Sequence, residues 1–182
     1  GWAHNEGLRF ASNQNADYVL ILDQDSLPND HMVNVLATEL NNKRSLGIKV
    51  AAVGARYIGS HRGHSSYFVK FGLISFLHQY CYKQHGRMVF SADVLISSGA
   101  LFSLEAIESV GLMDEELFID HVDTEWFLRA SSMGWEFFGI CNAVMEHGLG
   151  DRTIRVWVGR WRYLPVHKSF RYYYVFRNSI LL

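Results

Sequence analysis

The sequence has few of the residues that mark several classes of protein. Only 2 of its 182 residues are proline and 19% are charged, whereas 49% are hydrophobic, so it lacks the composition of a disordered chain. The 2 cysteines, Cys81 and Cys141, are far apart and predict neither a disulfide framework nor a zinc site. A reducing, cytosolic setting is the simpler interpretation of such cysteines. The chain is long enough for one domain with a hydrophobic core.

Long apolar runs and a strong charge of one sign are also missing. No segment has the roughly 18 consecutive apolar residues of a spanning helix, and no signal peptide opens the sequence. The net charge of −1 provides no general attraction to nucleic acid, so no nucleic-acid partner is expected. The sequence opens without Met and without a strand before its first helix, which predicts that it begins inside a domain.

Apolar runs and amphipathic segments alternate along the chain, which predicts an α/β fold. The segment 59–88 has no clear periodicity and is expected to be a long, partly mobile active-site segment. Helices are expected at 5–15, 29–42, 104–110 and from 123 to a stop near Gly134, and buried strands at 17–22, 49–57, 90–102 and 135–146.

Two carboxylates follow the apolar run 17–22, in the sequence Asp23-Gln24-Asp25. Open α/β sheets bind ligands at the carboxyl ends of their strands. Two carboxylates at this spacing can share a hard divalent cation, Mg²⁺ or Mn²⁺, that also contacts phosphate oxygens. The alternative is an ordinary strand-ending turn, in which aspartate satisfies its own backbone.

A second group of acids comprises Asp120, Asp123 and Glu125, three acids within six residues. A carboxylate in a partly buried site can act as a general base for an attacking hydroxyl. Helix capping is the alternative, because the helix dipole favours acids in a first turn. Capping explains Glu125 well and explains three acids less easily.

Two strand ends carry further candidates. His147 follows the run 135–146 and could complete a metal site begun by the aspartates, although a lone histidine is more often an ordinary polar partner. Ser97-Ser98-Gly99 interrupts the strand at 90–102, and glycine inside a strand often marks close approach of a ligand or another backbone.

The tail, residues 152–182, interleaves basic and aromatic side chains. This composition suits the interface of an anionic membrane. An equal alternative is that the aromatics pack a C-terminal helix on the core while the arginines stay solvated. The arginines concerned are Arg152, Arg155, Arg160, Arg162 and Arg171.

Four motifs in order, LILDQDS, SSGAL, FIDHVDTEWFLRA and EHGLGDRT, resemble those of the inverting family 2 glycosyltransferases with the GT-A fold. The wording is closest to bacterial rhamnosyltransferases that use dTDP-rhamnose in O-antigen and related polysaccharide synthesis. The resemblance implies a Rossmann-like, mixed but mainly parallel sheet flanked by helices, whose N-terminal strands are missing. Residues 1–151 would be a partial catalytic domain and 152–182 a basic, aromatic and membrane-proximal segment of the same domain.

The resemblance also implies roles for the D-x-D region. Asp23 and Asp25 match the acidic pair that holds the metal bridging the donor diphosphate, with Asp25 as the safer direct ligand. His147 matches a histidine that in some members also reaches the metal. Ser98 and Gly99 match a strand-end segment that lines the donor and acceptor cleft.

VDTEW resembles the family's E-D-x-D helix start and puts Asp123 at the position of the base. Val122 stands where the first acid is usual, so Asp120 remains an alternative base. Glu125 and Trp126, from the same helix start, are expected to contact donor or acceptor. The sequence Asn5-Glu6-Gly7 resembles an N-x-G helix opening that follows strands which grip the nucleotide base.

These features predict a metal-dependent, inverting glycosyltransferase that moves a sugar, rhamnose first among candidates, to a hydroxyl of a saccharide or lipid-linked acceptor. A cytoplasmic protein, peripheral on the inner face of the bacterial membrane, would fit this role. Two alternatives remain. A metal-dependent nucleotidyltransferase would want a phosphate-binding loop near its first strand, and a noncatalytic sugar-binding remnant would tolerate loss of the acids that are present here.

Overall fold

The computed structural model describes residues 1–59, 67–73, 75–81, 88–147, 152–157, 159, 161–166 and 168–182. Its helices are α1 (Trp2–Asn13), α2 (Met32–Ser45), α3 (Leu104–Val110), α4 (Val122–Ser132) and α5 (Ser169–Leu181). Its strands are β1 (Tyr18–Ile21), β2 (Ser26–Pro28), β3 (Val50–Gly59), β4 (Tyr67–Phe71), β5 (Phe76–Tyr80), β6 (Val89–Ala92), β7 (Ala100–Ser103), β8 (Glu136–His147), β9 (Arg152–Trp157) and β10 (Trp161–Val166).

Six strands form a mixed central sheet in the order β1-β7-β3-β8-β2, with β6 also paired to β8. Within the described residues, the pair β3 and β8 is parallel and the other pairs are antiparallel. An α/β fold with a mixed sheet is therefore confirmed, but the expectation of a mainly parallel sheet is wrong. The reason lies at 90–102, which forms two strands on different sides of the β3–β8 pair rather than one interrupted strand.

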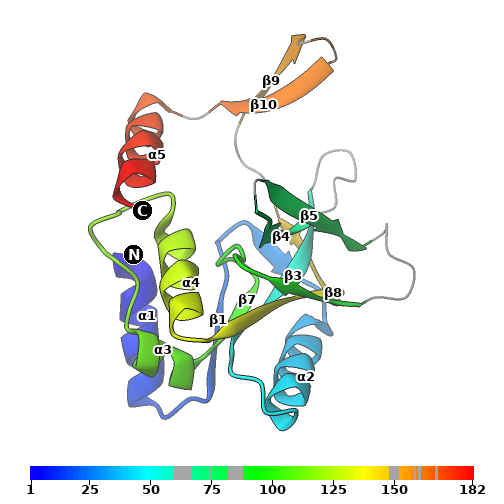
Figure 1. Ribbon diagram of the computed structural model, residues 1–182, viewed down its shortest axis with the longest axis vertical. Coiled ribbons are helices and arrows are strands. Elements are labelled where there is room, and N and C mark those ends of the chain that lie inside the picture. The colour runs from blue at the N-terminus through cyan, green and yellow to red at the C-terminus, as the bar shows by residue number, and fades with distance from the viewer. Residues whose placement is uncertain are drawn as a thin grey trace.

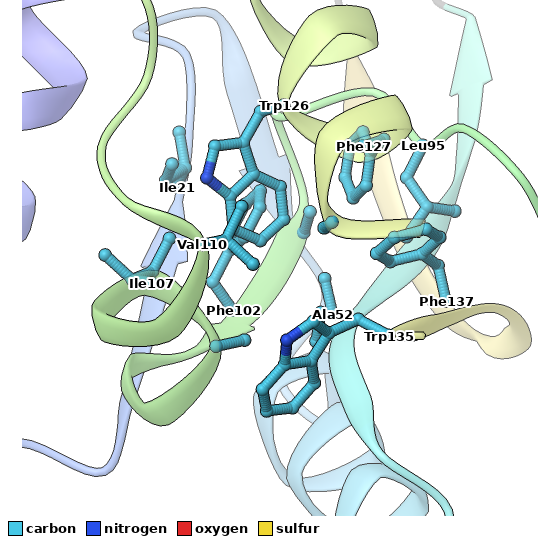
Figure 2. Close-up of a cluster of buried hydrophobic side chains, with 14 of the residues drawn as sticks. Ile21, Ala52, Leu95, Phe102, Ile107, Val110, Trp126, Phe127, Trp135 and Phe137 are labelled. Carbon is cyan, nitrogen blue, oxygen red and sulfur yellow. The ribbon is translucent and has the colours of Figure 1, made fainter. Parts of the chain in front are cut away.

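Helices cover both faces of this sheet (Figure 1), with α2 on one face and α1, α3 and α4 on the other. Successive residues of β3 point to opposite faces, so Ala52 joins the larger core cluster and Val53 joins the cluster under α2. Figure 2 shows the larger cluster, in which Trp126 packs edge-on against Phe102 with ring centroids 5.2 Å apart. Such aromatic pairs add about 1 kcal/mol to area burial and fix α4 on the sheet.

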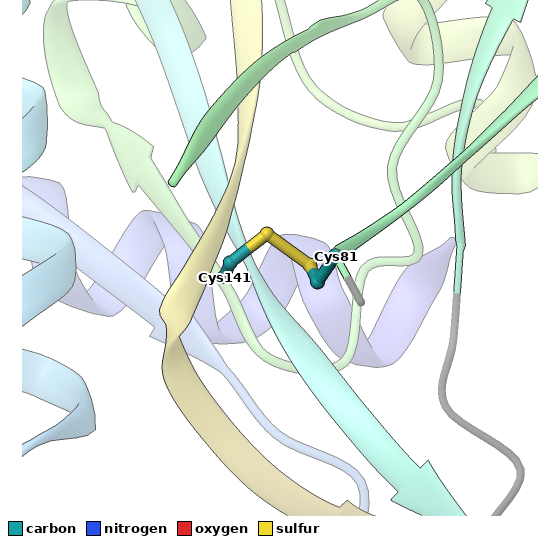
Figure 3. Close-up of a disulfide and its surroundings, with 2 residues drawn as sticks. All are labelled: Cys81 and Cys141. Carbon is teal, nitrogen blue, oxygen red and sulfur yellow. A yellow bond between two sulfur atoms is a disulfide. The ribbon is translucent and has the colours of Figure 1, made fainter. Parts of the chain in front are cut away.

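Cys81 and Cys141 form a disulfide with their Cα atoms 5.6 Å apart (Figure 3). The bond ties the end of the β4–β5 hairpin to the middle of β8. The expectation of two unpaired thiols is wrong, and the cytosolic setting that it suggested loses its basis, because disulfides persist mainly in oxidising compartments. Sequence spacing could not reveal the pair, since 60 residues separate the two cysteines.

The tail is a β9–β10 hairpin followed by α5. The side chain of Arg155 lies over the Trp161 ring, 3.9 Å from its centroid, so one basic and aromatic pair of the tail is engaged within the hairpin. Among the described residues, no helix has both the length and the apolar character needed to cross a membrane.

Candidate active site

The Asp23-Gln24-Asp25 turn is held by a buried serine. Ser98, 3% exposed, accepts a hydrogen bond at Oγ from the Asp23 amide at 3.0 Å and shares a 2.7 Å hydrogen bond with the Ser26 hydroxyl. The Asp23 carbonyl accepts from the Ser26 amide at 3.0 Å. Both ends of the turn are thereby fixed, while Asp23 and Asp25 themselves are exposed.

Gly99 allows β7 to begin directly behind this turn. Its φ of +79° is a conformation that favours glycine, and a Cβ there would lie 2.6 Å from the Sδ atom of Met145. Its amide donates to the Ile21 carbonyl at 2.8 Å, and its carbonyl accepts from Ala55 at 2.9 Å. The expectation at this glycine was close approach of a ligand or another backbone, whereas the group that approaches in the structure is the side chain of Met145 in β8.

The strand register brings the end of β8 beside the aspartate turn. His147 pairs with Ser26 in β2, and Ser26 follows Asp25 directly. The side chain of His147 lies outside the described part of the chain. No three His, Cys, Asp or Glu side chains among those described are grouped as a metal site, so the metal-binding roles of Asp23, Asp25 and His147 stay predictions.

Asp123 lies in the first turn of α4 with its carboxylate held by two backbone amides. One oxygen accepts from the Ser97 amide at 3.3 Å and the other from the Thr124 amide at 2.9 Å. The residue is half-buried and lines a cavity of about 270 Å³, together with Tyr57, Leu95 and Thr124 among others. The turn 97–99 therefore contacts the D-x-D turn through Ser98 and the predicted base through Ser97.

A larger cavity of about 780 Å³ adjoins the first. The two cavities share Val69, Val94 and Thr124. The larger one is walled by the β4–β5 hairpin, α4 and the end of α5, mostly with apolar side chains. Asp123 thus lines the smaller cavity, which adjoins a larger and mostly apolar one.

His4 on α1 was not among the predicted site residues. Burial lowers the pKa of its imidazole, and Asp23 and Asp123 act in the opposite direction. Its Nδ1 atom is buried and has no hydrogen-bond partner among the described residues. The charges of both acidic sites therefore act on one imidazole, and nothing in the local sequence around His4 signals this.

Three other predicted site residues have structural partners. The Asp120 carboxylate pairs with Arg171, and that of Glu125 pairs with Arg129 at 2.7 Å. Trp126 is fully buried, and its indole N–H donates to the Gly111 carbonyl at 2.8 Å. These contacts explain the three side chains by stability alone. The role of Asp120 as an alternative base, and the contacts of Glu125 and Trp126 with donor or acceptor, stay predictions.

A comparison with curated protein sequences finds a glycosyltransferase that is similar to this chain. The chain is 34% identical over 185 residues to the dTDP-rhamnosyl transferase RfbF of Shigella flexneri, a match that covers 99% of this chain and 58% of that protein. The chain is related to a glycosyltransferase. It spans a little over half the length of that curated relative. No protein-family model matches the chain.

The fold also has a counterpart among solved structures. The crystal structure of A197 from STIV superposes with a TM-score of 0.50 at 13% identity, over 88% of this chain and 73% of that one. At this identity the likeness concerns the fold alone.

Proposed function

We propose that this chain carries the catalytic centre of an inverting glycosyltransferase that moves rhamnose from dTDP-rhamnose to a hydroxyl of a saccharide or lipid-linked acceptor. The observation that carries the proposal is the turn 97–99, which contacts Asp23 through Ser98 and Asp123 through Ser97. The same turn thereby fixes the proposed metal site and the proposed base relative to each other. The name and identity of the relative support the donor.

The D-x-D turn fits a divalent cation in its chemistry. Asp23 and Asp25 are exposed carboxylates on a turn that Ser98 fixes, and oxygen ligands of this kind suit Mg²⁺ and Mn²⁺. His147 at the end of β8 is paired with Ser26 in β2, directly after Asp25. These three residues would hold the ion, which would offset negative charge on a departing diphosphate.

Asp123 is the proposed general base. The Ser97 and Thr124 amides orient its carboxylate, and the adjoining cavity of about 270 Å³ offers space for the acceptor hydroxyl. Asp123 takes the proton of the acceptor hydroxyl while the oxygen of that hydroxyl attacks the anomeric carbon from the side opposite the diphosphate. The bond between the anomeric carbon and the diphosphate breaks, and the diphosphate leaves. A single displacement of this kind inverts the anomeric configuration.

A peripheral membrane position forms part of the proposal. The outer side of α5 exposes Tyr173, Phe176 and Ile180, which are 64%, 70% and 85% accessible. Aromatic and aliphatic side chains in such an arrangement suit the interface of a bilayer. A lipid-linked acceptor would then be presented near the apolar cavity between the β4–β5 hairpin and α5.

The test is donor turnover by the full-length protein. We expect release of dTDP from dTDP-rhamnose in the presence of Mn²⁺ or Mg²⁺, its loss with Asp123→Asn, and a loss of metal dependence or activity with Asp25→Asn. Asp30→Asn, an exposed acid just beyond the turn, serves as the matched control. Consumption of a different sugar nucleotide would replace the donor. A folded protein that consumes none would refute glycosyl transfer.

A further inference from the structure

The loop that leads into α4 has an unusual backbone. Phe118, Asp120 and His121 each have a φ of +61°, a left-handed conformation that is uncommon outside glycine, although aspartate adopts it more readily than phenylalanine. Conformations of this kind persist when the surrounding structure over-determines them. The loop therefore requires contacts from elsewhere in the molecule.

Asn178 on α5 provides the first set of contacts. The residue is fully buried, and its Nδ2 atom lies 2.9 Å from each of the carbonyl oxygens of Leu117, Ile119 and Asp120. One amide nitrogen, which has two protons, thus lies within hydrogen-bond distance of three carbonyl oxygens of the loop. These carbonyls converge on a side chain about 60 residues away, so the contact is tertiary and not local to the loop.

Arg171, two turns earlier on α5, provides a second set of contacts to the loop. Its Nε and Nη2 atoms each lie 2.9 Å from a different oxygen of the Asp120 carboxylate, which is the two-pronged geometry that arginine makes and lysine cannot. The pair is partly buried, with side-chain exposures of 33% and 18%. Ser179 adds a hydrogen bond of 3.1 Å to the His121 ring.

The loop determines where α4 begins. His121 is the residue before the helix, and its carbonyl accepts from the Glu125 amide at 2.9 Å. Asp123 follows two residues later, so rotation of the loop would turn its carboxylate away from the Ser97 amide. Figure 1 shows α5 at the end of the chain next to the loop that precedes α4.

We infer that Arg171 and Asn178 are positioning residues, which clamp the loop 117–121 and thereby orient Asp123 towards the acceptor. The inference rests on the proposed role of Asp123 as base. It gives the basic and aromatic tail a role in supporting the catalytic site from outside, in addition to any contact with a membrane. It also explains why Asp120, an alternative base by sequence, has its carboxylate occupied.

The test uses Arg171→Lys and Asn178→Ala in the full-length protein, with Lys168→Ala as the control. Lys168 is exposed at the start of α5, so its variant removes a positive charge from the same helix without touching the loop. We expect kcat to fall about 10- to 100-fold in the two test variants, since displacement by about 1 Å can cost this much. KM for the sugar nucleotide should change less than about two-fold, because the D-x-D turn is untouched.

Hydrogen exchange separates positioning from general damage and from failure of the proposed function. Amides of 117–125 should exchange faster in both variants, while those of β3 and β8 keep their protection. Arg171→Lys retains the charge and is expected to fold even if Asn178→Ala does not. Unchanged exchange in the loop, or unchanged kcat in a folded Arg171→Lys protein, would overturn the inference. If the wild-type protein transfers no sugar, the proposed function fails, and loop exchange alone then decides whether the clamp exists.

Discussion

The Ser97 amide and the Asp123 carboxylate, 26 residues apart in the chain, are joined by a hydrogen bond of 3.3 Å. The next residue, Ser98, reaches 75 residues back to the amide of Asp23. A single tight turn therefore sets the spacing between a candidate metal site and a candidate base.

Replacement of Ser98 by alanine should loosen the D-x-D turn. The variant leaves the Asp23 amide and the Ser26 hydroxyl without their partner, and loss of such a buried hydrogen bond costs about 1–3 kcal/mol. We expect lower stability to urea and weaker Mn²⁺ binding by calorimetry. Ser97→Ala is the control, because Ser97 acts through its backbone amide. Equal metal affinity in the two variants would show that Ser98 does not support the metal site.

Gly99→Ala and Gly7→Ala should change stability in opposite directions. The first places a Cβ 2.6 Å from Met145 at a φ of +79°, so we expect a loss of roughly 2 kcal/mol or more. Gly7 lies on α1, where a Cβ would meet nothing within 4 Å, so alanine should stabilise by about 0.5–1 kcal/mol. Urea unfolding of the two variants measures both changes.

The Cys81–Cys141 disulfide should make stability depend on redox conditions. The bond joins residues 60 apart, and a chain-entropy treatment assigns such a loop about 4 kcal/mol. Reductant should lower the melting temperature of the wild-type protein and leave that of Cys81→Ser unchanged. A thiol titration that finds two free cysteines in the native protein as purified under oxidising conditions would contradict the bond.

Asp120→Asn and Asp123→Asn should affect catalysis to different degrees. Asparagine tolerates the left-handed backbone of residue 120 and can still accept one hydrogen bond from Arg171, so sugar transfer should fall only partly. Asp123→Asn removes the carboxylate that would take the proton of the acceptor hydroxyl, so sugar transfer should fall by about 100-fold or more. A greater loss at 120 than at 123 would identify Asp120 as the base.

The lowered pKa of His4 predicts a loss of stability in acid. Because burial favours the neutral imidazole in the folded protein, the unfolded chain binds a proton more readily, and stability falls as the pH drops below the ordinary histidine pKa of 6.5. Urea unfolding at pH 7.5 and pH 5.5 measures this. His4→Gln should show a smaller loss between the two pH values than the wild type, and an equal loss would exclude His4 as the source.

Much of the secondary structure could be read from local sequence. Ser103 caps α3 by accepting from the Ala106 amide at 3.3 Å, and α4 ends just before Gly134, whose φ is +81°. The strand before Asp23 and the helix start at Asp123 also lie where apolar periodicity predicts them. The secondary structure of the segment 59–88 was harder to predict. The β4–β5 hairpin inside it has exposed as well as buried aromatic residues, and its buried and exposed positions do not alternate regularly.

What the sequence by itself determined is where strands and helices end and which acids stand at those ends, because periodicity, capping and turn chemistry depend on residues close together in the chain. Only the tertiary structure decided that most strand pairs of the central sheet are antiparallel, that Cys81 meets Cys141, that Asp120 pairs with Arg171, and that the charges of Asp23 and Asp123 both act on His4. Each of these contacts joins residues far apart in sequence. Their formation depends on the path of the chain around the core, which no local pattern specifies.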